Sequence, residues 1–254
     1  MSSLSPIAGI PANFFGLLLI AITLSGCEKQ TRQAGGIADE GHPDEWTMLF
    51  DGQTTAGWRA MGKDTLPSGG WTVEDGVLMV NTDESEKGGD IITIEEYNDF
   101  ILDIEWKILT RGGNSGVKYF VKENIPANEA YGPGLEYQIL DDDNHEWMLE
   151  GKMKPGDYHT LAALYEIYPA ENRSVNPPGE WNYSRIVAKG MHVEHWLNNV
   201  KVLDYNRGSD DFKKRVLESK FAKHEKYGEA RQGHIMLQDH GSKMAFRNIR
   251  IKEL

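Results

Sequence analysis

Apolar and polar residues alternate along the segment 100–109, and this alternation constrains the fold more than any other feature of the chain. One set of positions is apolar, namely Phe100, Leu102, Ile104, Trp106 and Ile108. The positions between them are mostly polar, namely Ile101, Asp103, Glu105 and Lys107. Successive side chains of a strand point to opposite faces, so the pattern predicts a strand with one buried and one wet face. Such strands bury their apolar faces by packing sheet against sheet.

Similar segments recur between turn signals through most of the chain. Asp75-Gly76 separates two of them and is a strong signal for a hairpin. Strands are also predicted at 46–50, 71–74, 77–81, 116–122, 135–140, 159–165, 183–189, 191–198, 201–205, 234–238 and 244–252. About ten strands joined by Gly-rich turns predict an all-β sandwich or jelly roll.

The charged segment 209–226 departs from this pattern. Phe212, Val216 and Phe221 are spaced roughly as on one face of a helix, and Gly228 follows as a stop signal. The sequence therefore predicts one short inserted helix in an otherwise all-β fold.

Composition excludes one class of partner. The chain has 254 residues and a formal net charge of −12 at pH 7. An acidic surface repels phosphate backbones, so no nucleic acid partner is expected. The densest basic run, Lys213–Arg215, fits the solvated face of the predicted helix.

The N-terminus is typical of an export signal. Phe14–Leu24 is apolar and about a dozen residues long, which suits a signal peptide better than a membrane span. Leu24–Cys27 resembles the bacterial lipoprotein signal, in which the cysteine carries the lipid. The alternative is a plain apolar N-terminal helix, since Lys and Arg are absent before Phe14.

This interpretation sets the predicted organisation. Residues 1–26 form the lipoprotein signal peptide, 27–44 a flexible tether and 45–254 one jelly-roll domain. The resemblance to the lipoprotein signal implies that Cys27 is the lipid attachment site. Because Cys27 is the only cysteine, no internal disulfide can form. The expected location is the cell envelope, with a lipid anchor, at the outer membrane.

Polar side chains gather on three of the predicted strands. In 135–141, Glu136 and Gln138 share the face opposite the apolar residues, about 6.6 Å apart along the strand. In 233–240, Gln238 and His240 share the polar face. Asp141–Asp143 follow the first of these strands, as either a solvated turn or a loop that binds a hard cation or a hydroxyl.

Two further segments carry residues suited to sugars. The Gly-rich turn before Gly116 holds Asn114 and Ser115, and its backbone N–H groups could approach a ligand. The segment 179–198 contains tryptophans, histidines and asparagines, which offer flat apolar surface and planar polar groups. Within it His195 shares a face with apolar residues, so a buried, hydrogen-bonded histidine is the alternative to a functional one.

A set of short motifs in a fixed order resembles the 3-keto-disaccharide hydrolase family. The motifs are LFDG-x4-GW (49–58), W-x-V-x-DG (71–76), YNDFIL-x-IEW (97–106), GNSGVKY (113–119), LEYQILDD (135–142), ALY (163–165), GEWN (179–182), VEHWLNNVKVLDY (193–205), LQDHG (237–241) and FRNIRI (246–251). The resemblance covers residues 45–254 and implies a concanavalin A-like jelly roll. Asn199 stands where the family usually has glycine, and asparagine tolerates the positive φ of such a turn.

The resemblance implies cleavage of 3-keto-glycosides. A ketone at C3 acidifies the C2 proton, a base removes it, the C1 substituent leaves by β-elimination, and water then adds. The candidate catalytic residues are Glu136, His195 and His240. The candidate substrate-binding residues are Asn114, Ser115, Gln138, Tyr165, Glu180, Trp181, Asn182 and Gln238. No cofactor is certain; a divalent metal ion is one option, with Glu136, Asp141 and His240 as candidate ligands.

Two other functions remain open at this point. One is a non-catalytic carbohydrate-binding module on the same fold. The other is an ordinary glycoside hydrolase, which needs two carboxylates across the scissile bond. The strand 135–140 offers Glu136 and an amide, Gln138, on its polar face, which counts against the second function. A structural lipoprotein without either activity is the remaining alternative.

Overall fold

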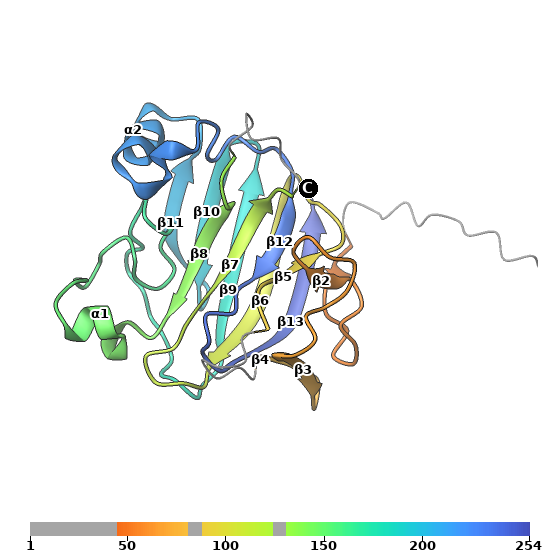
Figure 1. The fold of residues 1–254 in the computed structure, drawn as a ribbon. Helices are drawn as coiled ribbons and strands as arrows, with labels where there is room; N and C mark the ends of the chain where they lie inside the picture. Colours follow the sequence, from red (N-terminus) through yellow and green to blue (C-terminus); the bar gives the residue numbers. More distant parts are fainter. Residues whose placement is uncertain (1–44, 81–87, 124–130) are drawn as a thin grey trace, which may run out of the picture. The chain divides into compact units, whose positions relative to one another are not determined.

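The computed structural model describes residues 45–80, 88–123 and 131–254, which belong to one compact unit. The predicted signal peptide, Cys27 and the tether lie outside the described residues. Two antiparallel sheets pack face to face as a jelly-roll sandwich, which confirms the predicted fold class (Figure 1). In the described part of the chain, no helix is long and apolar enough to cross a membrane.

The larger sheet has eight strands. Its order is β11 (Val200–Asn206), β10 (His192–Leu197), β9 (Asn182–Lys189), β6 (Phe100–Ile108), β13 (Met244–Glu253), β4 (Val77–Val80) and β3 (Trp71–Glu74), with β1 (Thr47–Met48) also paired to β13. The alternation that predicted β6 is observed, since its apolar set is buried and its polar set is mostly half-buried on the outer face. The predicted hairpin is β3–β4, and Asp75 and Gly76 take the positive φ angles that its turn requires.

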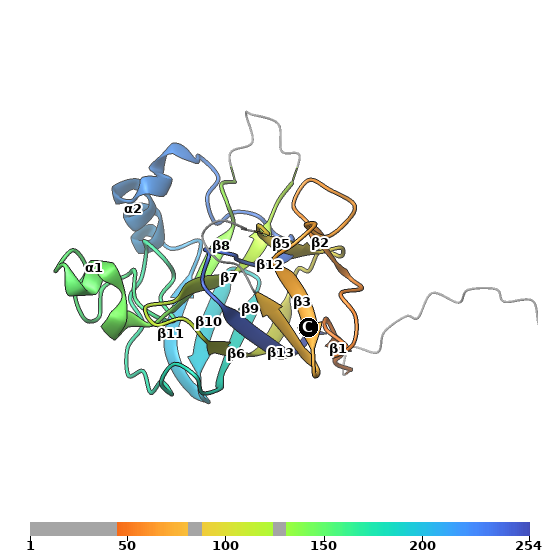
Figure 2. The same cartoon turned by 60° about the horizontal axis from the view of Figure 1, so that its bottom comes forward.

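The smaller sheet has five strands and carries the candidate site. Its order is β2 (Trp58–Ala60), β5 (Ile91–Thr93), β12 (His234–Leu237), β7 (Asn114–Val121) and β8 (Leu135–Leu140). Figure 2 shows this sheet stacked on the larger one. The short strands β2 and β5 were not predicted, because two or three residues carry too little alternation to register.

The space between the sheets is filled by large side chains from both. Trp106 and Phe100 enter it from β6, and Tyr119 and Tyr137 enter it from β7 and β8. Hydrogen bonds satisfy the polar ends of these rings, because Trp106 Nε1 donates to Ser184 Oγ at 2.8 Å and Ser184 Oγ donates to Tyr137 OH at 2.8 Å. The core therefore fixes which face of β7 and β8 points outward.

Helical segments flank the sandwich at one side. They are η1 (Asp142–Asn144), α1 (Glu146–Leu149), α2 (Asp210–Glu218) and η2 (Lys220–Lys223). The single helix predicted over 209–226 is two pieces, because Ser219 has an extended backbone and its hydroxyl accepts from Phe221 N–H. Ser209 caps α2 by accepting from Phe212 N–H. The helix α1 was not predicted.

The predicted strand 159–165 is wrong. Ala162 has φ +63°, a left-handed conformation that interrupts a ladder. The segment nevertheless follows the free edge of β8, since Ala162 N–H donates to Gln138 O at 2.8 Å and Tyr165 N–H donates to Glu136 O at 3.1 Å. It therefore works as an irregular border of the smaller sheet and brings Tyr165 beside β8.

The turn between β10 and β11 keeps the geometry expected of it. Asn198 and Asn199 have φ angles of +47° and +67°. Asparagine tolerates these angles, so the absence of glycine at 199 does not break the hairpin.

Candidate active site

The outer face of the smaller sheet gathers most of the predicted polar residues. Most residues of β7, β8 and β12 that point inward are apolar, such as Val117, Tyr137 and Ile235, so their neighbours along each strand point outward. Glu136 pairs with Lys118, and Gln138 pairs with Gly116. Gln238 extends the ladder of β12 by donating its backbone N–H to Gly116 O at 3.1 Å. Five outward side chains thus form one group, the outer-face cluster: Asn114, Lys118, Glu136, Gln138 and Gln238.

The side chains of the outer-face cluster are largely shielded from water, and they form an ion pair and a hydrogen bond with one another. Lys118 Nζ lies 3.4 Å from Glu136 Oε2, and these side chains are 13% and 9% exposed. Gln138 Nε2 donates to Asn114 Oδ1 at 3.1 Å. Glu136 and Gln238 are buried. A carboxylate, an ammonium group and three amides therefore meet on one face, which suits a ligand rich in hydroxyl groups.

Tyr165 and a set of charged residues border this cluster. Lys220 Nζ lies 4.2 Å from the centre of the Tyr165 ring and 3.3 Å from Glu166 Oε1. Glu166 Oε1 is also 3.2 Å from His159 Nε2, whose ring is held at Nδ1 by Asp157. Burial raises the pKa of Tyr165, and the nearby Lys220 ammonium opposes that shift. The border is thus a connected network rather than a set of free side chains.

A small cavity opens between the cluster and this border. It encloses about 140 Å³ and is lined by Asn114, Gln138, Leu140, His145, Glu146, Trp147, Met153, His159 and Tyr165. Three predicted substrate-binding residues, Asn114, Gln138 and Tyr165, therefore line one cavity beside Glu136.

His195 and Ser115 do not reach this face. His195 is fully buried between the sheets, where Nδ1 donates to Ala162 O at 2.9 Å and Nε2 accepts from Tyr119 OH at 2.8 Å. Burial lowers the pKa of His195 to about 4. Ser115 Oγ is also buried and donates to Gln238 O at 2.9 Å. The expectation of direct substrate contact is wrong for both, because the pleat turns them into the core.

The predicted metal ligands do not form a site in the described residues. Both carboxylate oxygens of Asp141 accept from Asn144 Nδ2, and Gly112 N–H donates to Oδ2. His240 is exposed beyond the end of β12. Among residues 45–80, 88–123 and 131–254, the one three-residue group within ligating distance is elsewhere, at His192, Glu194 and Asp204. Lys201 already pairs with both of its carboxylates.

The predicted segment 180–182 lies away from the outer-face cluster. Trp181 packs between Lys107 and Arg247, on the outer face of the larger sheet. Asn182 is buried, accepts from Asn176 N–H and Asn198 Nδ2, and donates to Asn176 O. Glu180 is exposed. These residues are therefore placed to support a turn rather than to bind a ligand at the cluster.

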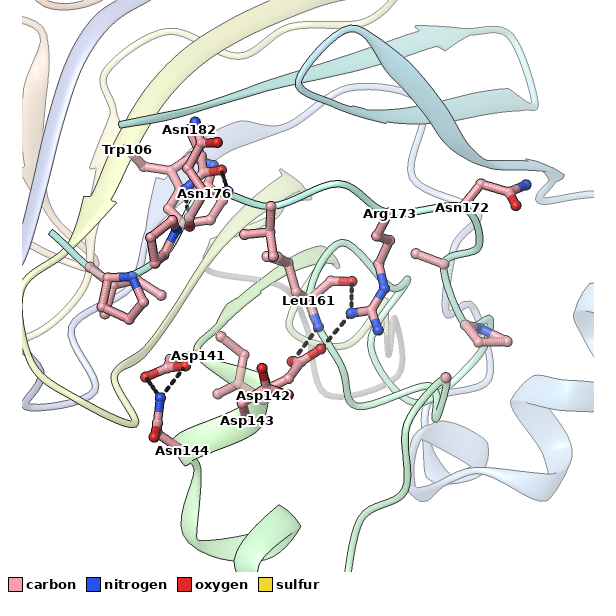
Figure 3. Close-up of a pocket in the computed structure, with 18 of the residues that line it drawn as sticks. Trp106, Asp141, Asp142, Asp143, Asn144, Leu161, Asn172, Arg173, Asn176 and Asn182 are labelled. Atoms are coloured by element: carbon pink, nitrogen blue, oxygen red, sulfur yellow. Dashed lines mark hydrogen bonds and ion pairs between the residues drawn. The ribbon is translucent and has the colours of Figure 1, made fainter. Parts of the chain in front are cut away.

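A larger cavity of about 820 Å³ lies at one end of the sandwich (Figure 3). Its polar lining is bonded to itself: Arg173 Nη1 lies 2.5 Å from Asp142 Oδ2, and Asp142 Oδ1 accepts from Leu161 N–H. Burial raises the pKa of Asp142, and Arg173 opposes that shift. In the outer-face cluster, by contrast, Gln238 Oε1 is buried without a partner in the described structure, so we place the candidate active site there rather than in this larger cavity.

Sequence reasoning missed two basic residues of the site. Lys118 was detectable, because it lies two residues after Gly116 and so shares its face of β7. Lys220 was not, because it reaches Tyr165 from η2, and helical spacing does not specify where such a turn docks.

The chain matches the sequence model of the 3-keto-alpha-glucoside-1,2-lyase-like domain over residues 45–252. The 3-keto-disaccharide hydrolase of Bacteroides thetaiotaomicron is 35% identical over 235 aligned residues, and the match covers 83% of this chain and 79% of that protein. Among solved structures, a candidate glycosyl hydrolase from Parabacteroides distasonis has a TM-score of 0.70 and 36% identity, covering 82% of this chain and 94% of that one. Another from the same organism has a TM-score of 0.62 and 30% identity, covering 83% and 100%. The chain therefore belongs to the 3-keto-alpha-glucoside-1,2-lyase-like family.

Proposed function

We propose that the chain is an enzyme that cleaves 3-keto-glycosides at the outer-face cluster. Its family and the name of its curated relative support a substrate of this kind. The observation that carries the proposal is the pair Glu136–Lys118, a carboxylate base beside a cation on a largely dry face. Proton abstraction next to a ketone needs both of these charges.

In the proposed first half of the reaction, Glu136 removes the C2 proton of the 3-keto sugar. The electrons move into the C3 ketone, and the Lys118 ammonium stabilises the negative oxygen that develops there. A positioned base contributes on the order of 10²–10⁴-fold to such a step. The enolate then expels the C1 oxygen with its bonding electrons, and Glu136 returns the proton to it.

In the second half, water adds across the resulting double bond. Its hydroxyl joins C1 and its proton joins C2, so the balance of the two steps is hydrolysis. The amide side chains of Gln138, Asn114 and Gln238 hold sugar hydroxyls, and Tyr165 borders the ring. The residues that were candidate metal ligands do not meet, so no step is assigned to a metal ion.

The same face also suits a carbohydrate-binding module. Such a module would bind unoxidised sugars and would tolerate loss of the Glu136 charge. An ordinary glycosidase is less well supported, because the outward neighbour of Glu136 on β8 is the amide of Gln138 rather than a second acid.

The test is turnover by protein starting after Cys27. Substrates are 3-keto-glucosides and 3-keto-trehalose beside the unoxidised sugars, with aglycone release and enone absorbance followed together. We expect turnover of the keto substrates alone, and its loss in Glu136→Gln with sugar binding retained. EDTA is expected to leave the rate unchanged. Sugar binding without turnover of any substrate would show a binding module instead.

A further inference from the structure

Gly116 lies in the middle of β7, where a glycine is otherwise unfavourable. Its φ is not in the left-handed region, so its backbone does not require glycine. A Cβ at this position would lie 2.0 Å from Gln238 Oε1 and 3.2 Å from Glu136 Oε1. Glycine in a strand often marks a close approach by another group. Here the approaching group is the Gln238 side chain, and the missing Cβ leaves room for it beside Glu136.

The oxygen that occupies this space, Gln238 Oε1, lacks a hydrogen-bond donor among the described residues. Gln238 is 3% exposed, and Oε1 is buried without a hydrogen-bond partner in the described structure. Buried polar atoms are normally paired, and one left unpaired in a native fold calls for an explanation. Glu136 Oε1 approaches the same point from β8. Two acceptor oxygens thus lie near one point beside Gly116, an arrangement that a donor from a ligand would complete.

We infer that Gly116, Gln238 and Glu136 form a hydroxyl-binding notch that selects substrates with a hydroxyl on the carbon that loses its proton. This inference rests on the proposed function. Gly116 is the floor of the notch, and Gln238 Oε1 accepts from the C2 hydroxyl while Glu136 removes the hydrogen on C2. Because both groups belong to one carbon, the notch aligns the C–H bond with the base. Gly116 is a positioning residue, since it acts through Gln238.

A double-mutant cycle tests the notch. Gly116→Ala places a methyl group where Gln238 Oε1 lies, and the flexible end of Gln238 can move away, so the fold is retained. We expect Gly116→Ala and Gln238→Ala each to lower kcat/KM about 100-fold, as loss of one positioned hydrogen bond does. The double variant is expected to be no worse than either single variant, because both remove the same contact. Gly69→Ala is the matched control, since its Cβ meets nothing within 4 Å and its φ is not left-handed.

A 2-deoxy-3-keto-glucoside supplies the second readout. It lacks the hydroxyl, so Gln238→Ala should not change its rate, whereas a merely structural role of Gln238 would slow both substrates. Multiplicative effects in the double variant, or Gly116→Ala as active as wild type, would overturn the notch alone. Absence of turnover by the wild-type protein on every keto substrate would refute the proposed function, and the notch with it.

Discussion

At the scale of single residues, the outer-face cluster differs from an ordinary wet face of a sheet in how little water reaches its charges. The side chains of Lys118 and Glu136 are mostly buried and 3.4 Å apart at their charged ends. An ammonium group acts more strongly on a developing negative charge when water is excluded. This pair therefore gives the proposed chemistry a base and a fixed positive charge.

Lys118→Met should lower kcat by about 10²-fold, because the enolate oxygen loses its cation. Methionine keeps the apolar stem but leaves the buried Glu136 carboxylate without its cation, so the melting temperature should also fall, and kcat is measured well below it. Lys107→Met is the control, since Lys107 lies over Trp181 on the opposite outer face. Equal kcat for Lys118→Met and wild type would remove Lys118 from the mechanism.

His195 should make stability depend on pH. Its folded pKa is about 4, below the ordinary value of 6.5, chiefly because it is buried. Between these two pKa values, His195 is therefore protonated in the unfolded chain and neutral in the folded protein. The free energy of unfolding should fall as pH decreases from 6.5 towards 4, by about 3 kcal/mol from this residue.

Urea unfolding across this pH range measures the effect. His195→Gln should flatten the dependence, whereas the half-exposed His192→Gln should retain it. An unchanged slope in His195→Gln would show that His195 is not protonated on unfolding in this range.

The face on which a polar side chain lies was predictable where the alternation along its strand was clear. Alternation along β8 placed Glu136 and Gln138 on one face, and the structure has both there. It could not place Gln238 against Glu136, because that contact depends on the order β12–β7–β8 and on the missing side chain at 116. Pairing order is a property of the whole sheet and leaves no local signal.

At the scale of elements, the strands were predicted better than the loops that complete the site. The bounds of β8 match the prediction, while the predicted strand 159–165 is a loop with a left-handed residue at Ala162. Its run of apolar residues, Leu161–Tyr165, is compatible with a buried strand, but tertiary hydrogen bonds to β8 determine its path. Tyr165 therefore lies beside β8, but in a loop rather than in the predicted strand.

The loop that contains Arg173 is tied to the end of β8 by Asp142. Arg173→Ala should lower the free energy of unfolding by about 2 kcal/mol, because it leaves a partly buried carboxylate without its partner. Adding Asp142→Asn should recover part of this loss, since an amide carries no charge. Lys214→Ala breaks a well-exposed pair and should cost well under 1 kcal/mol. Equal losses for the two single variants in urea unfolding would contradict this account.

At the scale of the whole molecule, the outer faces of the two sheets differ in how their polar groups are paired. The larger sheet presents a face on which charged residues pair with one another, such as Asp103 with Arg185 and Arg250. The smaller sheet presents the cluster with an unpaired acceptor at Gln238. Under the proposed function, a ligand would complete the pairing of polar groups on the smaller sheet alone.

We also propose that the chain is anchored to the cell envelope through Cys27, on the strength of the sequence alone. The full-length protein, expressed in a Gram-negative host, should sediment with membranes and incorporate labelled fatty acid. Cys27→Ser should carry no label and leave the membrane fraction. Label on Cys27→Ser equal to wild type would contradict the assignment.

The most direct test of the proposed chemistry follows the hydrogen at C2. A 3-keto-glucoside carrying deuterium at C2 is treated with the enzyme in ordinary water, and the sugar product is examined by NMR. We predict a primary isotope effect on aglycone release and hydrogen in place of deuterium at C2, because Glu136 removes that atom and water supplies its replacement. Aglycone release at an unchanged rate with deuterium fully retained, where the unreacted substrate also keeps its label, would show direct hydrolysis at C1 and contradict the account.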